Sequence, residues 1–223
     1  MNPSSHSPAQ SLPVGLLLGL TGGIMNSYTY LNRGGVFVTA ETGNLVLLGM
    51  HLAQGNWRRA LSCLVPILFF SLGVLTAEFF HLRHPQREHT LPWRQVMILT
   101  ECIVICIVSM LPLGRPDPLA TLLISFQSAI QMQSFRSFLG CPCATTFCTG
   151  NLRSGTESLF HFLARRDLNA RTHTCVYYGV ILAFVTGALL DSVLSPLFRG
   201  RTILLCCIPL LSVFFLLRRQ SSS

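Results

Sequence analysis

The chain has 223 residues, of which half are apolar and only 11% are charged, and its mean hydropathy is +0.53. This composition excludes an ordinary soluble domain, because several uncharged runs approach the roughly 20 residues that a helix needs to cross a bilayer. The net charge of +8 does not indicate a nucleic-acid partner, since the arginines are scattered at the ends of the apolar runs.

Apolar runs in chain order predict helices that cross the membrane at 12–31, 60–82, 96–113, 119–139, 172–197 and 202–217. Two further segments, 36–53 and 144–163, are less apolar, because each contains charged side chains and a glycine that weakens a helix. We expect that these two segments either cross the bilayer or enter it and return on the same side. The predicted fold is therefore an all-α integral membrane protein with six to eight transmembrane helices.

The first predicted helix carries Gly15, Gly19 and Gly23 at a spacing of four residues. Small residues on one stripe of a membrane helix let the backbone of another helix approach closely. We expect a second helix to pack along this stripe.

The second half of the chain repeats the first. Residues 1–11 form a polar tail, and the turn at 113–118 separates a first membrane repeat, 12–113, from a second repeat, 119–217. The tripeptide Thr42, Gly43 and Asn44 occurs again 107 residues further along the chain, as Thr149, Gly150 and Asn151. In membrane proteins such repeats face each other across a pseudo-twofold axis, and sites lie at their interface. Eight crossings would make the two repeats parallel, and six would make them inverted.

Each Thr-Gly-Asn tripeptide combines a hydroxyl, a residue that relaxes backbone sterics and an amide that can satisfy freed backbone groups. This combination is typical of a helix break at membrane depth. The ends of broken helices hold ions or substrates in transporters, so the two tripeptides are candidate binding residues. The pattern fits equally well a tight crossing of the two segments, in which the two asparagine side chains cap each other.

Glu41 directly precedes the first tripeptide, whereas the equivalent position of the second repeat is Cys148. Carboxyl groups within the membrane are costly and tend to mark ion or proton routes. Glu41 is therefore the candidate coupler for an ion or proton, and Arg136 is a candidate partner for such acidic groups. Glu78 and Asp191 lie near the ends of equivalent helices, and we expect them at the membrane interface.

Polar side chains also occur at the end of the first predicted helix and on the equivalent helix of the second repeat. Asn26 corresponds to Gln133, and Gln131 shares one helical face with other polar residues. Against lipid such a polar stripe would be costly, so it should face protein or water. These side chains either line a permeation path or only join helices by hydrogen bonds.

The basic residues are all arginines, and they are more numerous on the side of the termini whether six or eight helices cross. By the positive-inside rule, this bias predicts that both termini are cytoplasmic and that the protein resides in the inner cell membrane. Most of the nine cysteines lie within apolar runs, so we expect neither a disulfide framework nor a metal site, and no cofactor.

Residues 19–49 and 127–154 resemble the YoaK-like family of bacterial multi-pass membrane proteins, a family defined by a domain of unknown function. The similarity covers nearly the whole chain and implies a helical protein of the inner membrane. Members of that family commonly have an acidic residue where this chain has Asn26.

These patterns together predict a transporter or channel for a small solute or ion, with its site between the two Thr-Gly-Asn tripeptides. The competing interpretation is a membrane scaffold or accessory subunit that transports nothing, in which the same residues only lock helices together. We do not expect an enzyme, because the chain lacks a convincing catalytic set. The expected partners are the lipid bilayer, a small solute or ion, and further copies of the chain.

Overall fold

The computed structural model describes residues 8–83, 91–115, 117–146 and 148–219 of the chain. The described residues are almost entirely helical, which confirms the predicted all-α class. In chain order the helices are η1 (Pro8–Gln10), α1 (Leu12–Asn32), α2 (Glu41–Ala53), α3 (Trp57–Arg83), α4 (Leu91–Met110), α5 (Asp117–Ser134), α6 (Cys148–Arg165), α7 (Leu168–Phe198), η2 (Arg199–Cys206) and α8 (Cys207–Arg219).

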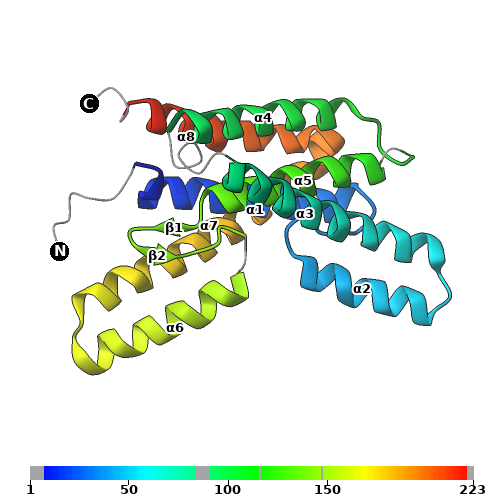
Figure 1. Ribbon diagram of the computed structural model, residues 1–223. Coiled ribbons are helices and arrows are strands. Elements are labelled where there is room, and N and C mark those ends of the chain that lie inside the picture. The colour runs from blue at the N-terminus through cyan, green and yellow to red at the C-terminus, as the bar shows by residue number, and fades with distance from the viewer. Residues whose placement is uncertain (1–7, 84–90, 116, 147, 220–223) are drawn as a thin grey trace.

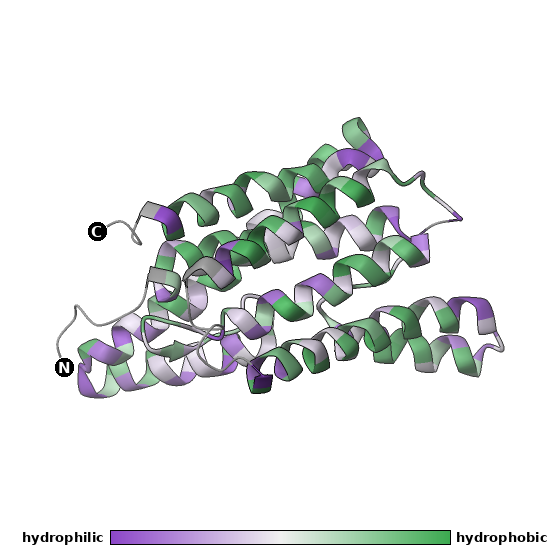
Figure 2. Cartoon of the chain, turned by 45° about the horizontal axis from the view of Figure 1, so that its top comes forward, coloured by the Kyte–Doolittle hydropathy of each residue, from purple (hydrophilic) through white to green (hydrophobic). Residues whose placement is uncertain are grey.

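Three stretches among the described residues are long and apolar enough to cross a membrane: Trp57–Arg83, Trp93–Met110 and Leu168–Arg218. The last of these runs through both α7 and α8. Figure 2 shows apolar residues along most of the helices, with polar residues gathered at the helix ends and turns. Membrane residence of the chain fits this distribution.

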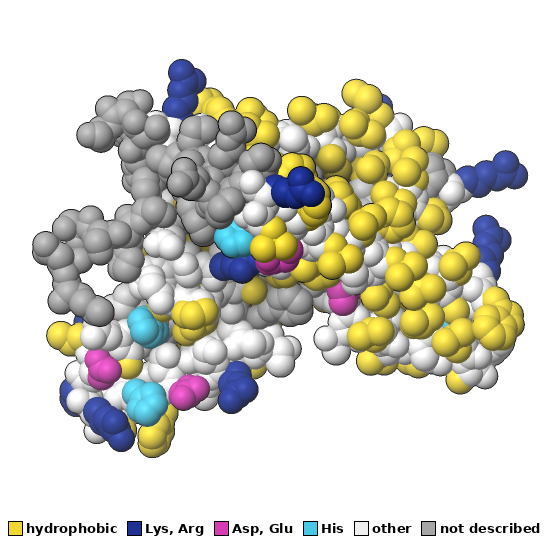
Figure 3. Space-filling view, viewed as in Figure 1, with side chains coloured by type: hydrophobic (Ala, Val, Ile, Leu, Met, Phe, Trp, Pro, Cys, Tyr) yellow, Lys and Arg dark blue, Asp and Glu magenta, His cyan; other side chains and the backbone are white. Residues whose placement is uncertain are grey.

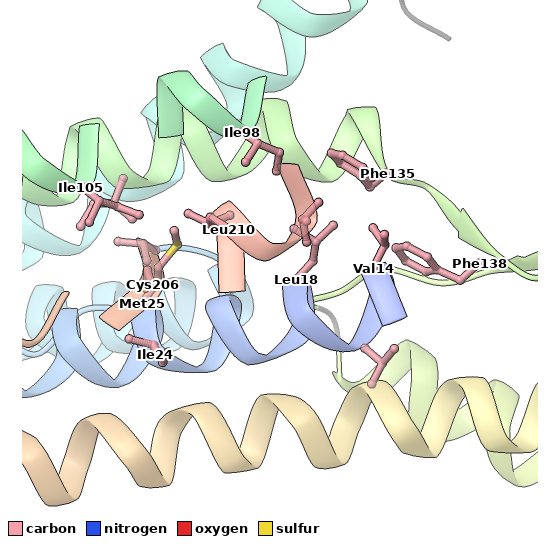
Figure 4. Packing of buried hydrophobic residues seen from close by; sticks show 14 of the residues in the cluster. Val14, Leu18, Ile24, Met25, Ile98, Ile105, Phe135, Phe138, Cys206 and Leu210 are labelled. Carbon is pink, nitrogen blue, oxygen red and sulfur yellow. The ribbon is translucent and has the colours of Figure 1, made fainter. Parts of the chain in front are cut away.

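The core lies between α1, α4, α5 and α8. Val14 and Leu18 of α1, Ile98 of α4 and Leu210 of α8 belong to this core, and all four side chains are fully buried; Val14 lies beside Phe138 (Figure 4). The α3 and α7 helices expose many apolar side chains, as do the outer faces of α4 and α8. Figure 3 shows such an apolar surface extending over α2 and α3.

The predicted glycine stripe is a site of close helix packing, on the side of α1 that meets α7. A Cβ atom added at Gly23 would lie 1.9 Å from the backbone oxygen of Phe184, and one added at Gly187 would lie 2.1 Å from that of Leu20. The α3 and α5 helices approach in the same way, since a Cβ at Gly73 would lie 2.5 Å from the backbone oxygen of Phe126. Only glycine allows backbones this close.

The chain differs from the sequence prediction between α5 and α6. The apolar run predicted as a helix to residue 139 ends as α5 at Ser134, and a short antiparallel hairpin follows, formed by β1 (Ser137–Phe138) and β2 (Cys141–Pro142). Leu139 and Gly140 form its two-residue turn, and both have positive φ angles, of 49° and 80°. Such a turn matches the twist of paired strands. The apolar side chains of this run are buried under α1 instead of facing lipid: Phe138 packs against Gly15.

Two helices, α2 and α6, extend away from the body of the bundle (Figure 1). The α2 helix packs against α3, and α6 packs against α7. Both begin one residue before a Thr-Gly-Asn tripeptide. This arrangement places the predicted site residues at the starts of two helices that belong to different helix pairs.

Candidate functional site

Asn26 joins the middle of α1 to the extended segment that precedes α2. Its side-chain Nδ2 donates to the backbone oxygen of Gly22 and to the hydroxyl of Thr39, while its Oδ1 accepts from the backbone N–H groups of Val38 and Thr39, at 3.2 Å each. Asn26 and Thr39 are both buried. The amide therefore fixes where the chain turns back toward α2.

Asn44, the last residue of the first tripeptide, holds the same segment from its other end. Its Oδ1 accepts from the backbone N–H of Phe37 at 2.9 Å, and its Nδ2 donates to the backbone oxygen of Phe37 at 2.7 Å. The second hydrogen of Nδ2 goes to Oε2 of Glu41 at 2.9 Å. The side chain of Asn44 is completely buried; both of its N–H groups donate and its oxygen accepts.

Asn151 repeats part of this arrangement in the second half of the chain. Its Nδ2 donates to the backbone oxygen of Ala144 at 2.6 Å, again seven residues earlier. Each asparagine is thus used within its own segment, and the alternative in which Asn44 and Asn151 cap each other does not describe this structure. The threonines and glycines differ in role, since Thr42, Thr149 and Gly150 lie on the surface of the chain.

The two segments that lead into α2 and α6 meet on one turn of α1. Thr39, two residues before α2, is bonded to Asn26. Thr146, two residues before α6, packs on Gly22, because a Cβ atom added there would lie 2.7 Å from the Cγ2 atom of Thr146. The beginnings of both tripeptide helices are therefore held close to residues 22–26 of α1.

Glu41 is the first residue of α2. Its Oε2 accepts the bond from Asn44, whereas its Oε1 is buried with no partner among the described residues. A negative charge is favourable at the N-terminus of a helix, but a buried carboxylate oxygen without a donor is costly. Arg136, a predicted partner for acidic groups, lies elsewhere, at an exposed position just beyond the end of α5. It forms an ion pair with Glu78 of α3 and donates to the backbone oxygen of Gln133.

The polar stripe of α5 faces α4. Gln131 donates to Oε2 of Glu101 at 2.9 Å, and Gln127 donates to the hydroxyl of Thr100 and the backbone oxygen of Met97. Glu101 is only 1% exposed, and its Oε1 has no partner among the described residues. Gln131 thus joins two helices, whereas Gln133 lies half-buried near the exposed end of α5.

Asp191, which we expected at the membrane interface, is buried inside the protein. Its side chain on α7 is 0% exposed, and both carboxyl oxygens are buried without a hydrogen-bond partner among the described residues. The nearby hydroxyls of Ser27 and Thr202 are directed to Ser192 and to the backbone oxygen of Arg199. Asp191 is buried because α1 packs so closely on α7 at Gly187, one helical turn earlier.

Arg33 is a further buried charged residue that the sequence did not single out. It follows α1, is 1% exposed, and donates to the hydroxyl of Tyr28, to Asp117 and to the backbone oxygens of Val108, Leu111 and Pro112. These bonds tie the end of α1 to the end of α4 and the start of α5. An arginine at the end of an apolar run usually lies at the membrane interface. No sequence signal therefore distinguishes the buried Arg33 from the other arginines at helix ends.

The sequence of the chain is similar to a known protein family. The family described as "Protein of unknown function (DUF1275)" matches residues 14–216. The UPF0700 transmembrane protein YoaK of Bacillus subtilis (strain 168) is 26% identical over 188 residues, which are 81% of this chain and 82% of that protein. No solved structure matches the chain.

Proposed function

The chain belongs to the DUF1275 family of membrane proteins, and on that premise we propose that it is a transporter or channel for a small solute or ion. In this proposal α2 and α6 are half-helices. They begin within the membrane at the Thr-Gly-Asn tripeptides and leave it on opposite sides. The helix N-termini of such half-helices are where membrane transporters present free backbone N–H groups to a substrate.

The observation that carries the proposal is the meeting of the two leading segments on α1. Thr39 bonds to Asn26 and Thr146 packs on Gly22, four residues away on the same helix. Each threonine precedes its helix by two residues. The α2 and α6 helices start close to each other and run in different directions (Figure 1). Paired half-helices are expected to have this arrangement. Two helices that cross the whole membrane would not need to start near the same turn of α1.

Cavities at the two ends of the bundle support six crossings. One cavity brings together Arg33 after α1, Arg58 of α3 and Arg115 between α4 and α5. The start of α3 therefore lies near the end of α1. In the proposed topology α2 accordingly enters the membrane and returns to the side on which α1 ends. Another cavity joins Gln10 before α1 to Ser134 at the end of α5.

Six crossings give the two repeats inverted topology. The packing of α1 against α7 then corresponds to the packing of α5 against α3, because α1 is equivalent to α5 and α3 to α7. Gly73 and Gly187, equivalent in the repeats, occupy the corresponding close contacts. Both termini lie on one side in this arrangement, and the arginine distribution makes that side the cytoplasm.

Glu41 is the proposed coupling residue. It starts one half-helix and has a buried oxygen that no described group satisfies. A proton or a cation would satisfy that oxygen, which is the property expected of a coupling carboxyl. Glu101 and Asp191 are further buried carboxyls with unpartnered oxygens, and they extend the set of groups through which a proton could pass.

Proton flux into liposomes tests the proposal. Purified protein is reconstituted into vesicles that contain a pH-sensitive dye, a membrane potential is imposed, and a panel of small ions and metabolites is added outside. The parent should acidify the vesicles faster than empty liposomes with at least one solute, and Glu41→Gln should abolish this difference. Glu157→Gln is the matched control, because Glu157 is an exposed carboxylate on the other half-helix and should leave the flux unchanged.

A non-transporting scaffold is the second candidate function, and one observation favours it. Asn26, Asn44 and Gln131 make helix-to-segment or helix-to-helix hydrogen bonds, as a purely structural role requires. Parent protein that behaves like empty liposomes with every solute would contradict transport and leave the scaffold as the better account.

A further inference from the structure

Two adjoining cavities lie where α1 ends, beside the starts of α3 and α5. Their volumes are about 190 Å³ and about 660 Å³, and both are lined by Gly34, Arg58 and Ser62. The smaller one also reaches Arg115 and Asp117, and the larger one reaches His51 and Arg59 of α2 and α3. We refer to the two together as the arginine pocket.

Arg33 forms part of the wall but has no donor left for a ligand. Its Nε donates to Tyr28, its Nη1 to Pro112 and Asp117, and its Nη2 to Val108 and Leu111. A guanidinium has five N–H groups, so Arg33 is fully used within the protein. Its role is to hold the pocket wall in place.

Among the described residues that line the arginine pocket, Asp117 is the only acidic one, and its side chain is likewise engaged. Its Oδ1 accepts from Arg33 at 3.0 Å and from the backbone N–H of Gly114 at 3.0 Å. It therefore balances the charge of Arg33 and leaves the other arginines of the pocket without a counter-charge.

Arg58, Arg59 and Arg115 remain available. All three are exposed, and none forms an ion pair with a described residue. The Nδ1 atom of His51, in the larger cavity, is buried and has no partner in the described part of the chain. Arg58 lines both adjoining cavities, Arg115 lines the smaller and Arg59 the larger, and the one described carboxylate there is already paired. These guanidinium groups make the potential inside the partly enclosed space positive.

Glycines keep the cavity open. Gly34, Gly35 and Gly114 have φ angles of 89°, 76° and 109°, and a Cβ atom added to any of them would meet nothing within 4 Å. The backbone thus borders open space at three positions, and a ligand can approach it without meeting side chains.

We propose that the arginine pocket binds a phosphate group. Arginine is the side chain that best matches phosphate oxygens, because its planar fork donates two parallel hydrogen bonds and keeps its charge at any physiological pH. The tetrahedral oxygens of a phosphate can accept hydrogen bonds from guanidinium groups on different sides, whereas the two oxygens of a carboxylate lie in one plane. Inorganic phosphate and phosphate monoesters carry up to two negative charges and so also balance more than one guanidinium. The phosphate belongs either to a dissolved small molecule or to the headgroup of a phospholipid. The site stands on the cavity and its charges and does not depend on the transport proposal.

Binding of two probes by the purified full chain in detergent tests this proposal. Inorganic phosphate is titrated calorimetrically, and short-chain phosphatidylglycerol is compared with phosphatidylcholine by native mass spectrometry. Arg58→Gln with Arg115→Gln removes two guanidinium groups of the pocket. Arg165→Gln with Arg166→Gln removes the same charge at the turn between α6 and α7, outside the pocket, and is the matched control. All proteins must elute as the parent does in size-exclusion chromatography.

The pocket double variant should weaken binding of at least one probe by about tenfold or more, while the control double variant binds as the parent does. Loss confined to inorganic phosphate identifies a dissolved ligand, and loss confined to phosphatidylglycerol identifies a lipid. The double variant Arg58→Lys with Arg115→Lys keeps both positive charges and should bind the probe with intermediate affinity. This result would show that the weaker binding of the Gln double variant comes from the lost charge and not from misfolding. The proposal is overturned if the parent binds neither probe or if the two Gln double variants weaken binding equally.

Discussion

The side chain of Asn44 pairs with both backbone groups of Phe37, accepting from its N–H and donating to its carbonyl. A neighbouring strand in a sheet would bond to the same two backbone groups, and here one side-chain amide makes both hydrogen bonds. It satisfies an extended segment that has no sheet neighbour and lies at the start of α2. Asn151 makes the donating half of the same arrangement with Ala144.

Asn44→Leu should therefore unfold more easily than the parent. The substitution leaves a partly buried N–H and carbonyl of Phe37 without partners, and each such group costs about 1–3 kcal/mol. Asn151→Leu removes one bond and should have a smaller effect. Thermal unfolding in detergent provides the comparison, and an Asn44→Leu midpoint equal to that of the parent would refute the structural role given to the amide.

Gly187→Ala should weaken the packing of α1 on α7. The new Cβ would lie 2.1 Å from the backbone oxygen of Leu20, and a backbone atom cannot rotate away, so the helices must separate. Overpacking of this kind costs about 1–3 kcal/mol or more. Gly49→Ala on α2 meets nothing within 4 Å and serves as the control. Equal thermal stability of the two variants would argue against the close contact.

Arg33→Gln should be among the most damaging substitutions of a charged residue in this chain. It leaves Asp117 without its partner and frees backbone oxygens at the end of α4, and breaking one side of a buried ion pair costs about 3–5 kcal/mol. Arg171→Gln removes an exposed arginine from α7 and should be nearly neutral. Resistance to proteolysis in detergent distinguishes the two, and similar cleavage rates would contradict the structural account of Arg33.

Gln131 and Glu101 should be coupled in a double-mutant cycle. Gln131→Leu removes the only described donor to a carboxyl that is 1% exposed, so it should destabilise the protein. Combining it with Glu101→Leu removes the unsatisfied group as well, and the double variant should be more stable than Gln131→Leu alone. Strictly additive losses in unfolding midpoint would show that the two side chains do not interact.

Much of the helical architecture follows from apolar runs and from glycines, because these features act locally. The stripe of Gly15, Gly19 and Gly23 predicted a close helix neighbour, and α7 is that neighbour at Gly19 and Gly23, whereas Gly15 contacts Phe138 of the hairpin. The sequence did not predict the hairpin at 137–142, because its apolar side chains continue a run that is typical of a membrane helix. Its turn depends on positive φ angles at Leu139 and Gly140, which hydropathy does not reveal.

The sequence marked the two asparagines of the tripeptides but not the bonds that they make. The recurrence of Thr-Gly-Asn identified Asn44 and Asn151, yet their partners are the backbone groups of Phe37 and Ala144, which no side-chain pattern marks. The burial of Asp191 also depends on a tertiary contact, the approach of α1 at Gly187. Such contacts join residues far apart in the chain, so periodicity cannot show them.

The most direct test of the six-crossing arrangement is the accessibility of single cysteines introduced into a chain freed of its native cysteines. Gln54→Cys lies between α2 and α3, Arg115→Cys between α4 and α5, and Arg165→Cys at the end of α6. A membrane-impermeant maleimide is applied to intact cells and to inverted vesicles. If α2 is a half-helix, positions 54 and 115 are labelled from outside the cell and position 165 only from the cytoplasmic side. Labelling of all three from the cytoplasmic side would mean that α2 and α6 cross the membrane, and would contradict the account.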